Sequence, residues 1–217
     1  MEERAFLALL LTGFVVAAAT FQTPAIAMWV GFAFAGYSVV ANDSIQTIGT
    51  FMASNTRTKW WMMWLFIGGL FLLTVSYSWV TNNGDVTFGR LASKGFETAP
   101  TQFTYLQITA PLFLLMLTRL QLPVSTTFLI LSCFAATAST IGGVLLKSLS
   151  GYAVAFVVAI AIWLIATRLM ENRLKGEAHP SWTVMQWITS GTLWSVWIMQ
   201  DAANIAVYLP RQLSGLE

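Results

Sequence analysis

Long apolar stretches alternate with short polar ones along most of the chain. A helix that crosses a bilayer needs about 20 mostly apolar residues. By that measure the pattern predicts about seven hydrophobic segments, at residues 5–21, 25–41, 60–80, 104–118, 128–146, 151–169 and 183–208. The pattern therefore predicts an all-α integral membrane protein with a single transmembrane domain over residues 1–217.

The composition agrees with a chain surrounded by lipid. Of its 217 residues 57% are hydrophobic and only 9% are charged, and the mean hydropathy is +0.69. Soluble domains usually carry about 25% charged residues, so this chain lacks the polar surface that water requires. The Lys and Arg residues between the predicted spans favour a cytoplasmic N-terminus. We expect a multi-pass protein of the cell membrane or bacterial inner membrane.

Several classes of function have no basis in this sequence. A single cysteine, Cys133, and a single histidine, His179, cannot build a disulfide framework or a Cys/His metal cluster. The net charge of +2, without a basic patch, gives no reason to expect a nucleic-acid partner. No glycine-rich nucleotide loop, nucleophile elbow or HExxH motif is present, so we expect neither an enzyme nor an organic cofactor.

Two acidic residues lie in or beside predicted spans, whereas the others fall in termini or loops. Asp43 lies in GYSVVANDSIQTIGTFMASN and Asp201 in WSVWIMQDAANIAVYLPRQL. A carboxylate at membrane depth costs about 2.5–3.5 kcal/mol on insertion scales, so it is a candidate functional group. The ordinary alternative is that each acid marks a helix end at the interface.

The two acid-bearing stretches resemble each other when they are aligned on their acids. In the first, Asn42 precedes the acid and Gln46 follows it by three residues. In the second, Gln200 precedes the acid and Asn204 follows it by three. Residues three apart share a helix face, so each stretch presents a carboxylate and an amide toward one point. Such repeated motifs indicate an internal repeat, which in transporters points to a central binding site.

A third stretch, PVSTTFLILS, begins an apolar segment with a proline and three hydroxyl residues. Pro123 suits the first turn of a helix, and Ser125, Thr126 and Thr127 follow where the first N–H groups lack partners. A cup of donors at the positive end of a helix dipole binds phosphate and similar anions. The alternative is an ordinary N-cap whose neighbouring hydroxyls bond back to carbonyls.

Together these stretches resemble the PiT family of inorganic phosphate transporters. VANDSIQTIGT is similar to the family's G-A-N-D-x-x-N-x-x-G-[TS] segment, with Val40 for Gly and Gln46 for the second Asn. PVSTT matches its P-[VI]-S-[ST]-T segment, and MQDAANIAVYLP is similar to the start of a second repeat, with Gln200 for the usual Asn. The resemblance implies a complete first repeat over residues 25–170 and an incomplete second one over 183–217.

The resemblance implies an inverted-repeat transporter with discontinuous or re-entrant helices, expected around residues 41–50, 120–127 and 198–205. It implies symport, in which uptake of inorganic phosphate is coupled to sodium or protons. The implied substrate ligands are Asn42, Asp43, Ser125, Thr126, Thr127, Gln200 and Asp201. The implied sodium ligands are Asn42, Asp43, Gln46, Asp201 and Asn204. Phosphate and two carboxylates need positive charge beside them, because like charges ~4 Å apart repel by several kcal/mol, and sodium would supply it.

Departures from the family pattern keep alternatives open. The second P-x-S-x-T segment is absent, so the chain is expected to be C-terminally short, half of a split transporter, or a protomer whose site is completed in a homo-oligomer. A transport-incompetent subunit that binds ions or a partner chain is one alternative function, and an unrelated membrane scaffold or enzyme is another. Because Gln46 and Gln200 are longer than Asn, sulfate or another tetrahedral oxyanion is an alternative substrate. The polar segment 81–102 is expected to be a loop or an amphipathic interfacial piece carrying Phe88, Leu91 and Phe96.

Overall fold

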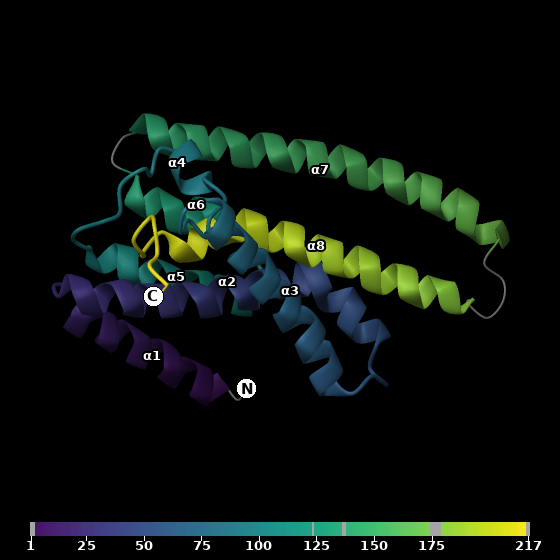
Figure 1. Cartoon of the computed structure of the whole chain (residues 1–217), viewed down its shortest axis with the longest axis horizontal. Coiled ribbons are helices and arrows are strands. Elements are labelled where there is room, and N and C mark those ends of the chain that lie inside the picture. The colour runs from purple at the N-terminus through teal and green to yellow at the C-terminus, as the bar shows by residue number, and fades with distance from the viewer. Residues whose placement is uncertain (1–2, 123, 136–137, 174–178, 216–217) are drawn as a thin grey trace.

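The computed structural model describes residues 3–122, 124–135, 138–173 and 179–215. Helix is the only regular secondary structure among these residues, which contain no strand, as the hydrophobic pattern predicted. The elements, shown in Figure 1, are α1 (Glu3–Thr20), α2 (Pro24–Ser54), α3 (Trp60–Thr81), α4 (Arg90–Ser93), α5 (Tyr105–Arg119), α6 (Thr126–Leu131), the 3₁₀ helix η1 (Ser132–Phe134), α7 (Ala138–Arg173) and α8 (Pro180–Ala206).

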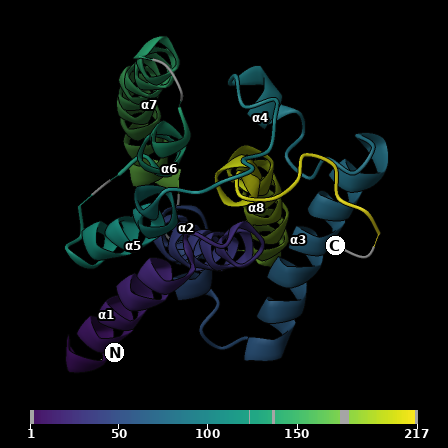
Figure 2. The ribbon, with the colours of Figure 1, turned by 90° about the vertical axis from the view of Figure 1, so that its left-hand side faces the viewer.

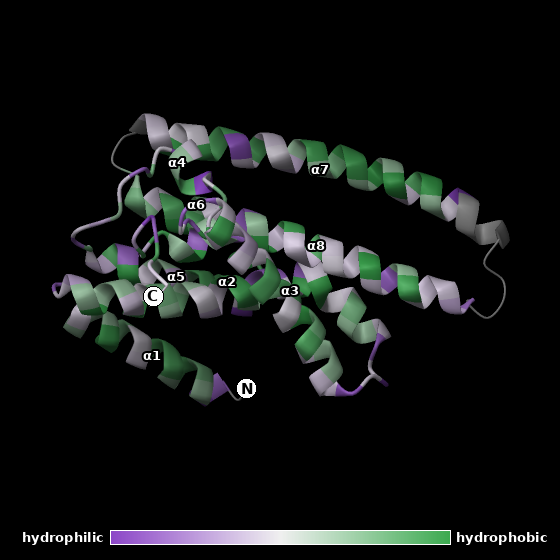
Figure 3. Cartoon of the chain, in the orientation of Figure 1, coloured by the Kyte–Doolittle hydropathy of each residue, from purple (hydrophilic) through white to green (hydrophobic). Residues whose placement is uncertain are grey.

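Four helices of the described chain are long and apolar enough to cross a membrane. They are α1, α2, α3 and the part of α7 from Ser139 to Arg168. Helix α5 has 15 residues, which span only about 22 Å at 1.5 Å per residue. Helix α8 has 27 residues, but its polar side chains make it less apolar than the other four. The exposed apolar surface of α7 (Figure 3) is suited to lipid.

The predicted span 128–146 is wrong. The chain there forms the short helix α6 and the 3₁₀ helix η1, and α7 begins only at Ala138. Helix α7 then runs for 36 residues and joins the rest of this window to the next predicted span, 151–169. Hydropathy misses this break because it averages over a window, and the window 128–146 is apolar on average in spite of Ser132, Ser139 and Thr140.

Helix α2 lies at the centre and packs against α5 and α8, while α1 covers α2 and α5 (Figures 1 and 2). Helices α2 and α8 run in opposite directions, so that Asn55 meets Gln186 at one end and Gly31 meets Tyr208 at the other. A Cβ atom at Gly31 would lie 2.3 Å from the Tyr208 ring. This close approach requires glycine, as is common where membrane helices pack tightly.

Only one of the three predicted helix interruptions is present. The chain leaves helix between α5 and α6, where Gln121 adopts a left-handed φ of 58°. Helices α2 and α8 continue without a break through 41–50 and 198–205, so those two predictions are wrong. Polar side chains do not open α2 there, because Thr47 donates to the Asp43 carbonyl at 2.8 Å and Asn42 bonds the neighbouring carboxylate.

The segment between α3 and α5 folds back onto the bundle beside α8 (Figure 2). Its apolar residues Leu91 and Phe96 are buried, so they face the bundle instead of lying along its outside. Arg211, after α8, donates to the carbonyls of Phe96 and Thr98 at 2.9 Å each. These contacts hold the segment that carries the one-turn helix α4 beside α8, and this places the basic residues of that segment across a pocket from α6.

Candidate functional site

A cavity of about 300 Å³ opens between α2, α6 and α8. We call it the acidic cavity, because both in-span carboxylates line it. Its lining includes seven of the residues that the sequence singled out: Asp43, Gln46, Ser125, Thr126, Thr127, Gln200 and Asp201. The fold therefore brings three stretches far apart in the sequence to one place.

The hydroxyls of α6 face the acid of α8. Thr126 Oγ1 donates to Asp201 Oδ1 at 3.0 Å. Asn204 Nδ2 lies 3.2 Å from Thr126 Oγ1 and 3.0 Å from Thr127 Oγ1, and it also donates to Asp201 Oδ1. Asn204 is completely buried, so these bonds form a closed polar network beneath the cavity wall.

The donor cup predicted at a helix N-terminus is not formed as expected. Helix α6 begins at Thr126 and is only six residues long, so its dipole adds little to the site. Ser125 is its N-cap, and the Ser125 hydroxyl accepts from the Phe128 N–H at 3.2 Å. Pro123, predicted for the first helical turn, lies outside the described residues.

Asp43 is held from two sides. Asn42 Nδ2 donates to Asp43 Oδ1 at 2.6 Å, and Trp197 Nε1 of α8 donates to Asp43 Oδ2 at 3.2 Å. The Trp197 ring stacks on Trp194 with 4.5 Å between centroids. The sequence did not mark Trp197 as a site residue, because a tryptophan in an apolar segment is usually an anchor or a packed ring.

Asn42, predicted as a ligand of both phosphate and sodium, lies behind the carboxylate and outside the acidic cavity. Its Oδ1 accepts from Thr118 of α5 at 2.8 Å, and with Gln46 it lines a separate cavity between α2 and the end of α5. Asn42 therefore positions Asp43 in this conformation instead of facing the substrate space.

One buried oxygen is available for a cation. Asn204 Oδ1 has no hydrogen-bond donor among the described residues, and it belongs to the side chain that bonds Asp201. Carboxylate and amide oxygens are suitable ligands for hard cations. The described chain contains no group of three or more His, Cys, Asp or Glu residues that could hold a metal ion. Asp201 and Asn204 are thus the best placed of the five predicted sodium ligands.

Three basic residues that the sequence did not single out lie beside this cavity. Arg90 of α4 lines it, and Arg90 also lines an adjoining cavity of about 300 Å³ together with Lys94 and Lys147. Burial, and after it the neighbouring charge of Arg90, lowers the pKa of Lys94 to about 8. A signal was present in TIGGVLLKSLSG, because a lysine inside an apolar span is itself a functional candidate.

Comparison of the chain with family models, curated proteins and solved structures finds no match. The similarity to PiT transporters therefore rests on the three motifs alone.

Proposed function

We propose that this chain transports inorganic phosphate across a cell membrane that it crosses several times, with sodium or protons as the coupling ion. The observation that carries the proposal is the meeting of two acid–amide motifs and the Ser125–Thr127 hydroxyls at one cavity. A scaffold has no need for this arrangement, because carboxylates among apolar helices are costly to maintain.

The arrangement of α2 and α8 supports an inverted repeat. The two helices carry the same motif and pack against each other in opposite directions (Figure 1). Inverted-topology repeats place corresponding helices in this way, and the substrate then lies between them. The acidic cavity lies at that position, between Asp43 on one helix and Asp201 on the other.

Charge at the cavity supports coupling to a cation. Asp201 has a neighbouring carboxylate in Asp43, and both are screened from water by apolar helices. An entering phosphate adds a third negative group, so binding of sodium, or protonation of a carboxylate, lowers the repulsion. The buried Asn204 Oδ1 beside Asp201 is the oxygen that such a sodium ion would use.

The test is uptake of radiolabelled phosphate into proteoliposomes under an inward sodium gradient. We expect uptake that falls when choline replaces sodium at constant pH, or, for proton coupling, uptake that follows an imposed pH gradient. Asp201→Asn should reduce uptake at least about tenfold. The matched control is Glu97→Gln, which removes an exposed acid outside the cavity and should leave uptake unchanged. Excess unlabelled sulfate, added as a competitor, reports selectivity. Absence of uptake under either gradient would reject the transport function.

A further inference from the structure

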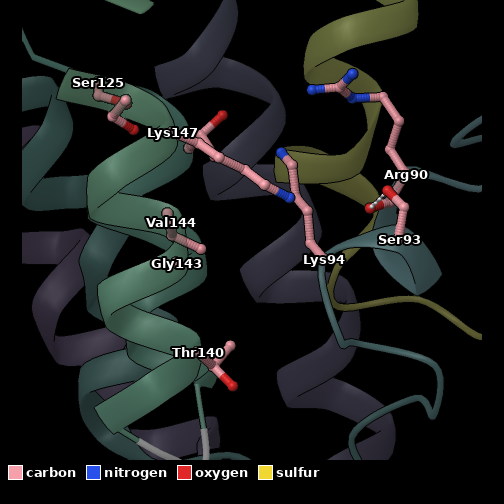
Figure 4. Close-up of a pocket in the computed structure, with 10 residues that line it drawn as sticks. Arg90, Ser93, Lys94, Ser125, Thr140, Gly143, Val144 and Lys147 are labelled. Carbon is pink, nitrogen blue, oxygen red and sulfur yellow. Dashed lines mark hydrogen bonds between the residues drawn. The ribbon is translucent and has the colours of Figure 1, made fainter. Parts of the chain in front are cut away.

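The second cavity, which we call the basic pocket, lies between α4, α6 and the first turns of α7. Lys147 of α7 and Lys94 extend into the same space from opposite sides, and Arg90 stands beyond Lys94 (Figure 4). Hydroxyl residues Ser125 and Thr127 complete the side that faces the acidic cavity. The pocket therefore gathers three cations and two hydroxyl groups from three segments of the chain.

These cations have no partner of opposite charge in contact with them. The described residues contain one ion pair, between Arg119 and Glu3, on another part of the surface. Lys94 Nζ and Arg90 Nε are both buried and have no hydrogen-bond partner among those residues. A buried cation without a partner is costly, and adjacent like charges increase that cost. The pocket is therefore electrostatically incomplete.

We propose that the basic pocket binds a phosphate group through Arg90, Lys94 and Lys147, with the Ser125 and Thr127 hydroxyls as additional hydrogen-bonding groups. A tetrahedral oxyanion carries several acceptor oxygens, which suits donors that approach from different sides. The arginine contributes a planar fork of donors, and the lysines contribute compact charges. The pocket volume of about 300 Å³ is at the low end for small-molecule sites, which suits a small anion.

This site differs from a sodium-bridged one in its source of positive charge. Three protein cations outnumber the two carboxylates of the adjoining cavity, so an anion here needs no sodium as a counterion. The two cavities share Arg90, Ser125 and Thr127. If this chain transports phosphate as proposed above, the basic pocket is the site that phosphate occupies before it enters the acidic cavity.

The phosphate group has two possible sources, inorganic phosphate and the headgroup of an anionic lipid. Basic pockets beside membrane helices bind lipid headgroups as well as free anions. Lys147 is exposed on α7, where Leu146 and Leu149 are exposed as well, so both sources have access. Inorganic phosphate and a short-chain phosphatidic acid are therefore titrated separately.

The experiment is calorimetry on the purified full chain in neutral detergent, with choline as the only bulk cation. We expect inorganic phosphate, phosphatidic acid or both to bind, and Lys94→Gln and Lys147→Gln each to weaken that binding at least about tenfold. Lys59→Gln, which removes an exposed lysine elsewhere, should leave the affinity unchanged. Binding of inorganic phosphate identifies a free anion as ligand, and binding of the lipid alone identifies a headgroup. Absence of binding by both probes, or equal affinity in the two lysine variants and wild type, overturns the proposal.

The variants are first compared by thermal melting, so that a misfolded protein is not scored as a lost site. Lys147→Arg, which keeps the charge on an exposed position, should retain binding within a few-fold and gives a second reading if Lys147→Gln is unstable. Asp201→Asn distinguishes this proposal from the transport function. It should abolish uptake yet preserve or strengthen binding in choline, because it removes a negative charge near Lys94.

The pH dependence gives an independent readout, for which sulfate is the better probe because its charge stays constant near neutral pH. The groups that face Lys94 are Arg90 on α4, Lys147 on α7 and, across the shared wall, Asp201 on α8. The Lys94 pKa is lowered to about 8 in the free protein, so Lys94 loses its proton as the pH rises through that value. We expect sulfate affinity to fall several-fold between about pH 7 and 9.5 in wild type. The fall should be absent in Lys94→Gln, and an equal fall in that variant would remove Lys94 from the site.

Discussion

Helices α2 and α8 each carry one Asn, one Asp and one Gln in their acid–amide motif, but the amide that bonds the acid stands at a different position in each. In α2 the amide before the acid, Asn42, bonds the carboxylate of Asp43. In α8 the amide after the acid, Asn204, bonds the carboxylate of Asp201. The remaining amide of each motif, Gln46 in α2 and Gln200 in α8, is exposed and lines the acidic cavity. Each helix therefore has one buried supporting amide and one amide that faces the ligand space.

A two-fold axis that related the two helices would superpose the residue before one acid on the residue before the other. The exchange of the two amides is therefore a departure from exact two-fold symmetry between α2 and α8. The departures from the PiT pattern fall on the cavity side of this arrangement. Gln46 and Gln200 are the two replaced amides, whereas the supporting Asn42 and Asn204 are retained. Relative to that pattern, the chain keeps the amides that bond its acids and differs in the amides that line the acidic cavity.

The two acids also differ in how far their surroundings are satisfied. Both oxygens of Asp43 accept hydrogen bonds, one from Asn42 and the other from Trp197. At Asp201 the hydrogen bonds from Thr126 and Asn204 both converge on Oδ1, and Asn204 Oδ1 has no donor among the described residues. A cation beside Asp201 would give Asn204 Oδ1 a partner, whereas both carboxylate oxygens of Asp43 already accept hydrogen bonds.

The largest effect expected from this difference is on sodium binding. A ligand that binds only the folded state raises stability by RT ln(1 + [L]/Kd). We expect sodium, compared with choline, to raise the Tm of wild type and of Asp43→Asn, and Asp201→Asn to lose that increase. Thermal melting in detergent at equal ionic strength makes the measurement. If Asp43→Asn loses the increase and Asp201→Asn keeps it, the cation belongs to α2 and the comparison is wrong.

A smaller effect is expected on stability when the supporting amides are removed. Asn204→Ala leaves Asp201, Thr126 and Thr127 without their shared donor, so we expect a loss of about 2–3 kcal/mol of unfolding free energy. Asn42→Ala removes one bond to Asp43 and leaves the bond from Trp197, so we expect about 1 kcal/mol. Reversible denaturation in detergent measures both.

The control for these two variants is Gln46→Ala. Gln46 is exposed and makes no side-chain hydrogen bond in the described structure, so its removal should change stability by no more than about 0.5 kcal/mol. Equal losses of unfolding free energy in Asn42→Ala and Asn204→Ala would show that the two amides contribute equally. That result would contradict the expectation drawn from the larger number of hydrogen bonds that Asn204 makes.

Hydrophobic pattern was sufficient to predict the helical class and most helix positions, because burial in lipid requires long apolar runs. The hydrophobic pattern was not sufficient to predict where a helix breaks and where it continues. In 41–50 and 198–205 the family resemblance implied breaks, yet both helices are intact, and Thr47 bonds the Asp43 carbonyl within α2. In 128–146 the reverse occurred, because the window is apolar on average although the helix ends at Leu131 and a new helix begins at Ala138.

The residues of the candidate site were also predicted only in part. The repeated spacing around Asp43 and Asp201, together with the hydroxyl stretch Ser125–Thr127, was enough to select seven of the twelve residues that line the acidic cavity. The basic residues were missed because Arg90 and Lys94 belong to a polar connection whose path depends on tertiary contacts, including those of Arg211 with Phe96 and Thr98. No local pattern in the sequence specifies that such a connection folds back beside α8.

The smallest effect is expected where the chain departs from the family pattern. Gln46→Asn and Gln200→Asn shorten the two cavity-facing amides without touching the supporting network, so stability should change by no more than about 0.5 kcal/mol. Each should alter the preference for phosphate over sulfate by a few-fold, because one methylene moves the amide relative to the anion. Competition uptake with both anions measures the preference. Because both glutamines line the same cavity, we expect the two variants to shift the preference in the same direction and the double variant to shift it further. Opposite shifts would mean that the two glutamines face different parts of the ligand.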